Sequence, residues 1–244
     1  MSLVDDTQTL GLRPCSRANC AQTPLGIITR RGFLAAGSAA AMAGGLVATP
    51  TQAQSGLTPD AALDGLMAGN ARFTAGRLTS FDEDLAILRQ HTEGKQEPFA
   101  AVLSCADSRV PVELIFDQSI GHVFVGRVAG NVCSPEMFGS LEYGAAALGI
   151  PLIMVLGHEG CGAVKAAIAG QPVPGQISAL FAPIRPAVER AGPDLQATIK
   201  ANAQIQADLL RTASPVIAGL VEQRKLKVVA ACYELASGRV SLLS

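Results

Sequence analysis

Residues 151–157 read PLIMVLG, a continuous apolar run that begins at a proline and ends at a glycine. Branched, uncharged residues in a run of this length are typical of a strand that is buried on both faces. Other apolar runs occur at 99–104, 122–127 and 226–235, and a short partner strand is expected at 239–243. The stretches between these runs have helical spacing. Buried strands that alternate with helices predict an α/β fold, a single domain with a mostly parallel β-sheet flanked by helices.

The expected helices are marked by their first residues. Thr58 precedes Pro59, and Ser134 precedes Pro135, which places a capping side chain and a proline where a helix begins. The helices are predicted at residues 59–74, 84–91, 134–148, 161–169, 176–190 and 195–222.

The composition excludes several classes of protein. Lys and Arg number 19 against 20 Asp and Glu, so no basic excess exists to neutralise a nucleic acid, and no nucleic-acid partner is expected. Aromatic residues are 4% and Trp is absent, which argues against a stacking surface for bases. Hydrophobic residues are 49% of 244, enough to bury the core of one domain. Six cysteines are too few for a disulfide scaffold.

The first fifty residues have the order of an export leader. Residues 29–34 read TRRGFL and precede an uncharged, weakly apolar stretch at 33–48, after which a polar segment ends at Ala53. The paired Arg30 and Arg31 resemble a twin-arginine signal, which an export machinery reads as an address. An amphipathic or anchoring helix is the alternative. Cleavage is expected after Ala53, with Ala48 as a second candidate. The prediction is therefore a periplasmic or otherwise exported protein without a stable membrane anchor.

The chain then divides into three parts. Residues 1–53 are the predicted twin-arginine signal peptide, and residues 54–98 are expected to form an N-terminal helical arm. Residues 99–244 are expected to form the α/β domain that contains the catalytic metal site. The active site of a parallel sheet lies at the carboxyl ends of its strands, so the residues that follow each strand are the candidates.

Soft metal ligands follow two of the predicted strands. Cys105 comes directly after one strand, and His158 and Cys161 come after another. Two cysteines and one histidine with an open fourth position is a recognised pattern of catalytic zinc. Buried cysteines and a hydrogen-bonded loop histidine are the structural alternative.

Asp107 and Arg109 stand two residues apart, directly after Cys105. In extended chain they project to the same side, so the guanidinium can grip and orient the carboxylate. An oriented carboxylate beside a metal could accept the proton of a metal-bound hydroxide. An ordinary surface ion pair is the alternative for these two residues taken alone.

Several stretches together resemble the β-class carbonic anhydrases. They are LMAGNARF at 66–73, SCADSRVP at 104–111, FVGRVAGN at 124–131, GSLEYG at 139–144, VLGHEGCGA at 155–163 and ACYELASGRV at 231–240. Their order and spacing match the family from about Leu63 to the end of the chain.

The resemblance implies a function and a site. Cys105, His158 and Cys161 would hold one Zn²⁺ per chain, and Asp107 and Arg109 would form the dyad that orients the zinc-bound hydroxide. That hydroxide would attack carbon dioxide to give bicarbonate and a proton in a reversible reaction.

The family also implies residues for the substrate and a partner subunit. Gln118 falls, within one residue, where many members bind substrate, and Gly162 would permit close approach at the start of a helix. The resemblance further implies a homodimer or a higher even oligomer.

The sequence departs from the family at two places. Glu159 and Gly160 replace a small polar pair between His158 and Cys161, and Gly126 replaces a valine. Glu159 is expected to add negative charge near the site.

Four further residues carry no expected role in the chemistry. Cys133 and Cys232 are interpreted as buried free thiols, and His91 and His122 as bystanders rather than ligands.

Three alternative functions remain open at this point. Hydrolysis of carbon disulfide or carbonyl sulfide would use the same site. A non-catalytic, zinc-stabilised binding protein would have no use for the pair Asp107 and Arg109. A thiol redox protein is disfavoured because no Cys-x-x-Cys is present.

Overall fold

The computed structural model describes residues 56–80 and 96–244, so the leader at 1–53, His91 and the helix expected at 84–91 lie outside the described residues. In chain order the elements are α2 (Pro59–Thr74), β1 (Ala100–Ser104), α4 (Val112–Ile115), β2 (Val123–Arg127), α5 (Pro135–Ala146), β3 (Leu152–His158), α6 (Gly162–Ala169), the 3₁₀ helix η1 (Gly175–Leu180), α7 (Phe181–Ala191), α8 (Leu195–Ala213), α9 (Pro215–Glu222), β4 (Lys227–Tyr233) and β5 (Val240–Leu243).

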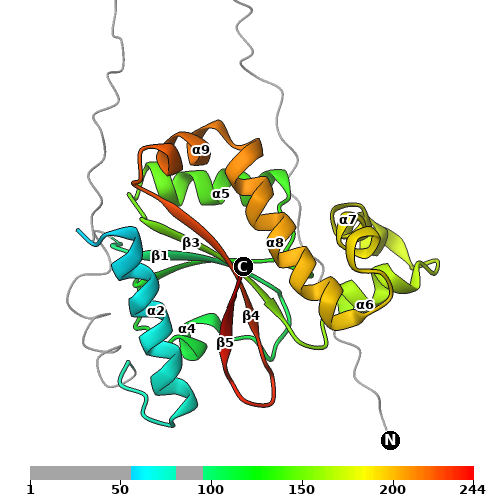
Figure 1. Cartoon of the computed structure of the whole chain (residues 1–244), viewed down its shortest axis with the longest axis horizontal. Helices are drawn as coiled ribbons and strands as arrows, with labels where there is room; N and C mark the ends of the chain where they lie inside the picture. The colour runs from blue at the N-terminus through cyan, green and yellow to red at the C-terminus, as the bar shows by residue number, and fades with distance from the viewer. Residues whose placement is uncertain (1–55, 81–95) are drawn as a thin grey trace, which may run out of the picture. The chain divides into compact units, whose positions relative to one another are not determined.

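The strands form a five-stranded sheet in the order β2-β1-β3-β4-β5 (Figure 1). β2 with β1, β1 with β3, and β3 with β4 are parallel, and β5 runs antiparallel to β4 at one edge. The carboxyl ends of β1, β2, β3 and β4 therefore lie along the same edge of the sheet. The prediction of a single α/β domain with a mostly parallel sheet flanked by helices is confirmed.

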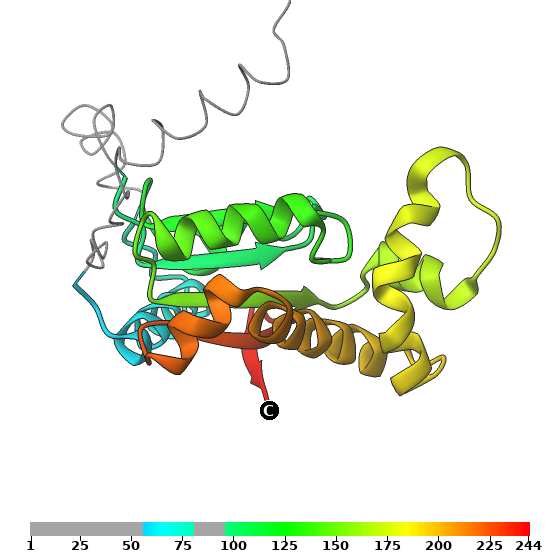
Figure 2. The same cartoon turned by 90° about the horizontal axis from the view of Figure 1, so that it is seen from above.

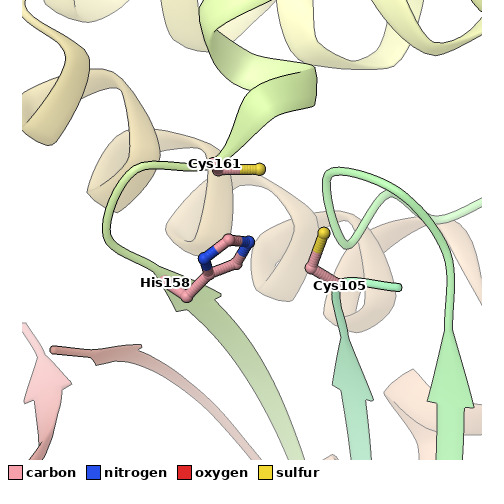
Figure 3. Close-up of side chains that lie close together, drawn as sticks. All are labelled: Cys105, His158 and Cys161. Atoms are coloured by element: carbon pink, nitrogen blue, oxygen red, sulfur yellow. The ribbon is translucent and has the colours of Figure 1, made fainter. Parts of the chain in front are cut away.

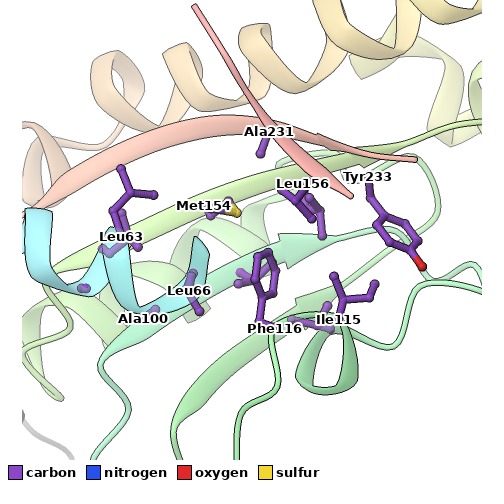
Figure 4. Close-up of a cluster of buried hydrophobic side chains, with 14 of the residues drawn as sticks. Leu63, Leu66, Ala100, Ile115, Phe116, Met154, Leu156, Ala231 and Tyr233 are labelled. Carbon is purple, nitrogen blue, oxygen red and sulfur yellow. The ribbon is translucent and has the colours of Figure 1, made fainter. Parts of the chain in front are cut away.

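Each strand of the sheet interior contributes to two hydrophobic cores. In β1, Ala100 and Val102 join one core while Ala101 and Leu103 join the other, because successive side chains point to opposite faces. The first core lies between the sheet and helices α2 and α4, where Met154 of β3 is also buried (Figure 4). Helices α5, α8 and α9 cover the second face (Figure 2). Burial on both faces explains why these strands are apolar throughout.

Helix α2 docks against the α/β domain through a close backbone contact and a buried amide. A Cβ added to Gly69 would lie 1.8 Å from the carbonyl oxygen of Phe116, so only glycine fits there. The next residue, Asn70, is 3% exposed. Its Nδ2 donates to the carbonyl oxygens of Ile115 (3.1 Å) and Gly238 (2.8 Å). These contacts join α2 to α4 and to the turn between β4 and β5.

The single helix expected at 195–222 is wrong, because the structure divides it into α8 and α9. Ser214 is extended, with ψ 112°, and its hydroxyl oxygen accepts a hydrogen bond from the backbone N–H of Ile217 at 3.1 Å. Pro215 then occupies the first position of α9, where a missing N–H costs nothing. The same Ser-Pro signature that marked the start of α5 marks a new helix here.

Smaller differences concern short elements. The helix expected at 176–190 is a 3₁₀ helix, η1, followed by α7. The four-residue α4 was not expected, since a single turn carries no helical periodicity. Across the described ranges, 56–80 and 96–244, every helix is too short or too polar to cross a bilayer.

Candidate metal centre

The three predicted metal ligands converge at the carboxyl edge of the sheet. Cys105 follows β1, His158 is the last residue of β3, and Cys161 is the N-cap of α6. β1 and β3 are adjacent, and Ser104 pairs with Leu156 in their register. One donor atom from each of the three side chains lies within 4.8 Å of the others, and all three residues are buried (Figure 3). The structure thus brings together ligands that are more than fifty positions apart in the sequence.

The imidazole of His158 is oriented as a metal ligand requires. The side chain is fully buried, and its Nδ1 lies 2.9 Å from the carbonyl oxygen of Glu159. Nδ1 therefore carries the proton and Nε2 carries the lone pair. Nε2 is buried and has no hydrogen-bond partner among the described residues. A buried acceptor without a partner is costly in a protein interior, and a metal ion bound by Nε2 and the two thiolates would satisfy it.

The side chains of Cys105 and Cys161 shift each other's pKa values in opposite directions. A hydrogen bond from Cys161 lowers the pKa of the Cys105 thiol, and the same contact raises the pKa of Cys161. The backbone N–H of Gly130 also donates to Cys105 Sγ, at 3.3 Å. Cys105 is therefore the sulfur that holds negative charge most readily. The donor set of two sulfurs and one imidazole nitrogen fits Zn²⁺, which prefers these ligands in tetrahedral sites.

Asp107 and Arg109 form the bidentate pair that the sequence predicts. Arg109 Nε lies 3.0 Å from Asp107 Oδ1, and Nη2 lies 2.8 Å from Oδ2. The backbone N–H of Arg109 adds a third hydrogen bond to Oδ1, at 2.9 Å. These hydrogen bonds hold the pKa of Asp107 far below its usual range, so the carboxylate stays ionised. Oδ2 also lies 3.9 Å from His158 Nε2, which places the carboxylate at the mouth of the metal centre.

Arg127 was not singled out from the sequence, although it lies inside the quoted stretch FVGRVAGN. It is the last residue of β2, and its Nε donates to the carbonyl oxygen of Cys105 at 2.9 Å. Its Nη2 donates to the carbonyl oxygen of Asp107. One guanidinium therefore holds the backbone at both Cys105, a predicted metal ligand, and Asp107. No residue pattern indicates this contact, because it depends on the register between β1 and β2.

The two substrate-binding predictions remain predictions. The side-chain amide of Gln118 donates to the carbonyl oxygen of Phe116, 2.8 Å away in the same turn. A Cβ added to Gly162 would meet nothing within 4 Å in the described part of the chain. A need for glycine there would have to come from a substrate or a second subunit.

Glu159 makes a structural contact in addition to the charge that was expected of it. Its backbone N–H donates to the carbonyl oxygen of Tyr233 at 3.0 Å, and its Oε2 accepts from the N–H of Leu235 at 3.1 Å. The loop between His158 and Cys161 is thereby fixed to the end of β4. This explains how a long side chain is accommodated between two predicted metal ligands.

Cys133, Cys232 and His122 lie outside the Cys-His-Cys group. Cys133 and Cys232 are free, with Cys232 buried and Cys133 partly buried. Burial raises their pKa values to about 12 and about 11, respectively, so both are neutral thiols at physiological pH. His122 packs edge-on against Phe99 with ring centroids 6.4 Å apart, away from the metal ligands in the group of three.

Known proteins match both the sequence and the fold. Residues 100–240 match the family model described as carbonic anhydrase. A carbonic anhydrase of Mycolicibacterium smegmatis is 36% identical over 198 residues, which cover 76% of this chain and 94% of the relative. The solved β-carbonic anhydrase of Coccomyxa, in complex with acetazolamide, has a TM-score of 0.60 at 26% identity over 74% of this chain and 86% of its own. One of two tetrameric β-carbonic anhydrases of Sordaria macrospora has the same fold, with a TM-score of 0.59 at 21% identity, and the match covers 75% of this chain and 96% of that one.

A Cys-His-Cys group beside an ionised carboxylate, at the carboxyl edge of a parallel sheet, defines a candidate metal-dependent enzyme site. With the matches above, the chain belongs to the β-class carbonic anhydrase family, as its motifs predict. It is accordingly an enzyme, a lyase of the carbonic anhydrase type.

Proposed function

We propose that this chain binds one Zn²⁺ through Cys105, His158 and Cys161 and catalyses the reversible hydration of carbon dioxide to bicarbonate and a proton. The observation that carries the proposal is the unpartnered, buried Nε2 of His158, which faces two cysteine sulfurs within 4.8 Å. A bound zinc ion would supply a Lewis acid that lowers the pKa of a water molecule from 15.7 toward about 7.

In this reaction the protein's own side chains orient the nucleophile and accept a hydrogen bond from it. Arg109 occupies one side of the Asp107 carboxylate with two side-chain hydrogen bonds, so the remaining lone pairs of Oδ2 point in a fixed direction. Because Asp107 stays ionised, it can only accept a hydrogen bond from a nucleophile and cannot donate one. An acceptor held in this way turns the nucleophile's free lone pair toward the substrate. Gln118 and Gly162 are proposed to contact the carbon dioxide or bicarbonate.

The proposal extends to assembly and location. We propose a homodimer or a higher even oligomer, which the tetrameric Sordaria relative supports.

Residues 1–53 are proposed to be a twin-arginine signal peptide that directs the protein to the periplasm, on the strength of Arg30 and Arg31 before a weakly apolar stretch. Replacing both arginines with lysine keeps the charge, so the precursor should accumulate in the cytoplasm, folded and active. Unchanged export of that variant would refute the twin-arginine assignment.

The test of the catalytic proposal combines metal analysis with kinetics on the same purified protein. We expect about one zinc per chain and rapid carbon dioxide hydration in a stopped-flow assay with a pH indicator. Parallel assays with carbon disulfide and carbonyl sulfide distinguish the alternative hydrolases, which would turn over those substrates in preference. Zinc without turnover of any of the three would support a zinc-stabilised binding protein instead.

A further inference from the structure

Helix α8 carries two amide side chains on its buried face. Asn202 and Gln206 are one helical turn apart, and both are fully buried. Gln206 Nε2 donates to Asn202 Oδ1 at 3.3 Å and to the carbonyl oxygen of Pro183 at 3.0 Å. Burying a polar side chain is costly unless it is hydrogen-bonded, and packing alone would be served better by leucine. The pair therefore points to a requirement other than packing.

That requirement is visible in the partners of the two amides. Asn202 Nδ2 donates to the carbonyl oxygen of Gly130 at 2.8 Å. Gln206 Oε1 accepts from the backbone N–H of Cys133, also at 2.8 Å. Both contacts hold the loop between β2 and α5, one at each end of the segment 130–133. Figure 3 shows this region of the chain passing beside Cys105.

The loop that they hold contributes a hydrogen bond to the metal centre. The N–H of Gly130 lies 3.3 Å from Cys105 Sγ, while the carbonyl oxygen of the same residue is the acceptor for Asn202. Gly130 has φ +77°, and a Cβ there would lie 2.9 Å from Ile184 Cδ1. Residues other than glycine rarely adopt this backbone conformation. The amide of Asn202 fixes the residue from the opposite side.

We propose that Asn202 and Gln206 are positioning residues of the metal centre, which hold Gly130 so that its N–H donates to the Cys105 sulfur. The inference rests on the proposed zinc function. Hydrogen bonds to a ligating thiolate withdraw charge from the sulfur, and outer partners of this kind change metal affinity by about 10- to 100-fold. Through this chain of contacts, α8 adjusts how strongly Cys105 donates to the metal, although neither amide touches a ligand.

The experiment compares Asn202→Leu and Gln206→Met with the wild-type protein, and Gln204→Leu is the control. Gln204 is on the same helix, but its amide donates to the carbonyl oxygen of the terminal residue, Ser244. Each protein is prepared with zinc and with Co²⁺ in its place. The first readout is the rate of zinc loss to excess chelator. The second is the wavelength of the sulfur-to-cobalt charge-transfer absorption.

We expect zinc loss to accelerate on the order of 10-fold in Asn202→Leu, because the loop that holds the Cys105 sulfur in place is released. The cobalt absorption should move to longer wavelength, because a sulfur without its hydrogen bond is easier to oxidise. Gln206→Met should shift both readouts less and in the same direction, and Gln204→Leu should shift neither. If Asn202→Leu does not fold, Gln206→Met carries the test with the same two readouts.

An unshifted cobalt absorption in folded Asn202→Leu and Gln206→Met, together with a normal rate of zinc loss, would overturn the inference. So would a loss of thermal stability alone, because that is all a purely structural role predicts. A wild-type protein that holds no zinc or does not hydrate carbon dioxide would instead refute the proposed function, so the two failures are distinguishable.

Discussion

Asp107 Oδ2 lies 3.9 Å from His158 Nε2, which is too long for a hydrogen bond. The carboxylate is held there by Arg109 from the opposite side. Oδ2, a hydrogen-bond acceptor, therefore lies beside the nitrogen that we propose to bind the metal.

The dyad can be removed without touching the metal ligands. Asp107→Asn keeps the shape of the side chain but loses the charge and one acceptor, so zinc should stay near one per chain while carbon dioxide hydration falls by about 10- to 1,000-fold. Arg109→Lys should also lose activity, because an ammonium cannot reproduce the two-pronged grip. Zinc content and stopped-flow rates measured on the same samples check this. Wild-type turnover in Asp107→Asn would exclude the carboxylate from the mechanism.

The cysteines can be sorted by the same metal analysis. Cys161→Ser replaces a soft anionic ligand with a neutral hydroxyl, so the protein should lose most of its zinc and essentially all activity. Cys133→Ser is the matched control, since Cys133 lies outside the Cys-His-Cys group. This variant should keep both its zinc and its activity. Equal zinc content in the two variants would remove Cys161 from the site.

Two glycine substitutions in helix α2 test how this helix packs against the rest of the domain. Gly69→Ala would place a Cβ 1.8 Å from a backbone oxygen, so the helix must move and the free energy of unfolding should drop by about 3 kcal/mol or more. Gly65→Ala in the same helix meets only the Phe99 ring, at 3.5 Å, and should be neutral or up to about 1 kcal/mol stabilising. Thermal or denaturant unfolding of both variants measures the difference. Similar stabilities would mean that α2 does not pack on Phe116 as described.

Alkaline pH should weaken the fold through Cys232. Burial raises the pKa of this thiol from 9.0 to about 11, so between these values the unfolded chain is ionised while the native protein keeps the proton. The native state then binds more protons, and the free energy of unfolding falls as pH rises through the window, by at most about 2–3 kcal/mol. Cys232→Ala should show a shallower decline from pH 9 to 11 in denaturant titrations. Parallel declines in the two proteins would contradict the assignment.

Much of the fold follows from local patterns in the chain. The run at 151–157 is β3, and the caps Thr58 and Ser134 mark the starts of α2 and α5, because these features act over a few residues. The boundary between α8 and α9 could have been predicted in the same way, since Ser214 and Pro215 repeat the pattern of Ser134 and Pro135. It was missed because an apolar periodicity continues across it.

Some residues of the candidate site could also be predicted from the sequence, and others could not. Cys105, His158 and Cys161 could be found from residue type and position after strands, and the structure brings them together. Arg127 and Asn202 could not, because each acts on backbone atoms that are distant in sequence. A buried asparagine in a helix has the same appearance in a sequence as an exposed one. Only tertiary packing shows which polar residue of α8 faces inward.

The register between β1 and β3 decides whether the three donor atoms can meet. Ser104 pairs with Leu156, so Cys105 leaves β1 one residue before the level of His158. A slip by one residue would turn Cys105 to the opposite face of the sheet, and the three donors could not meet. A metal bound by these three residues would therefore stabilise the native register and not the slipped ones. An occupied centre reports a correctly aligned sheet, which makes metal retention a practical assay of folding fidelity.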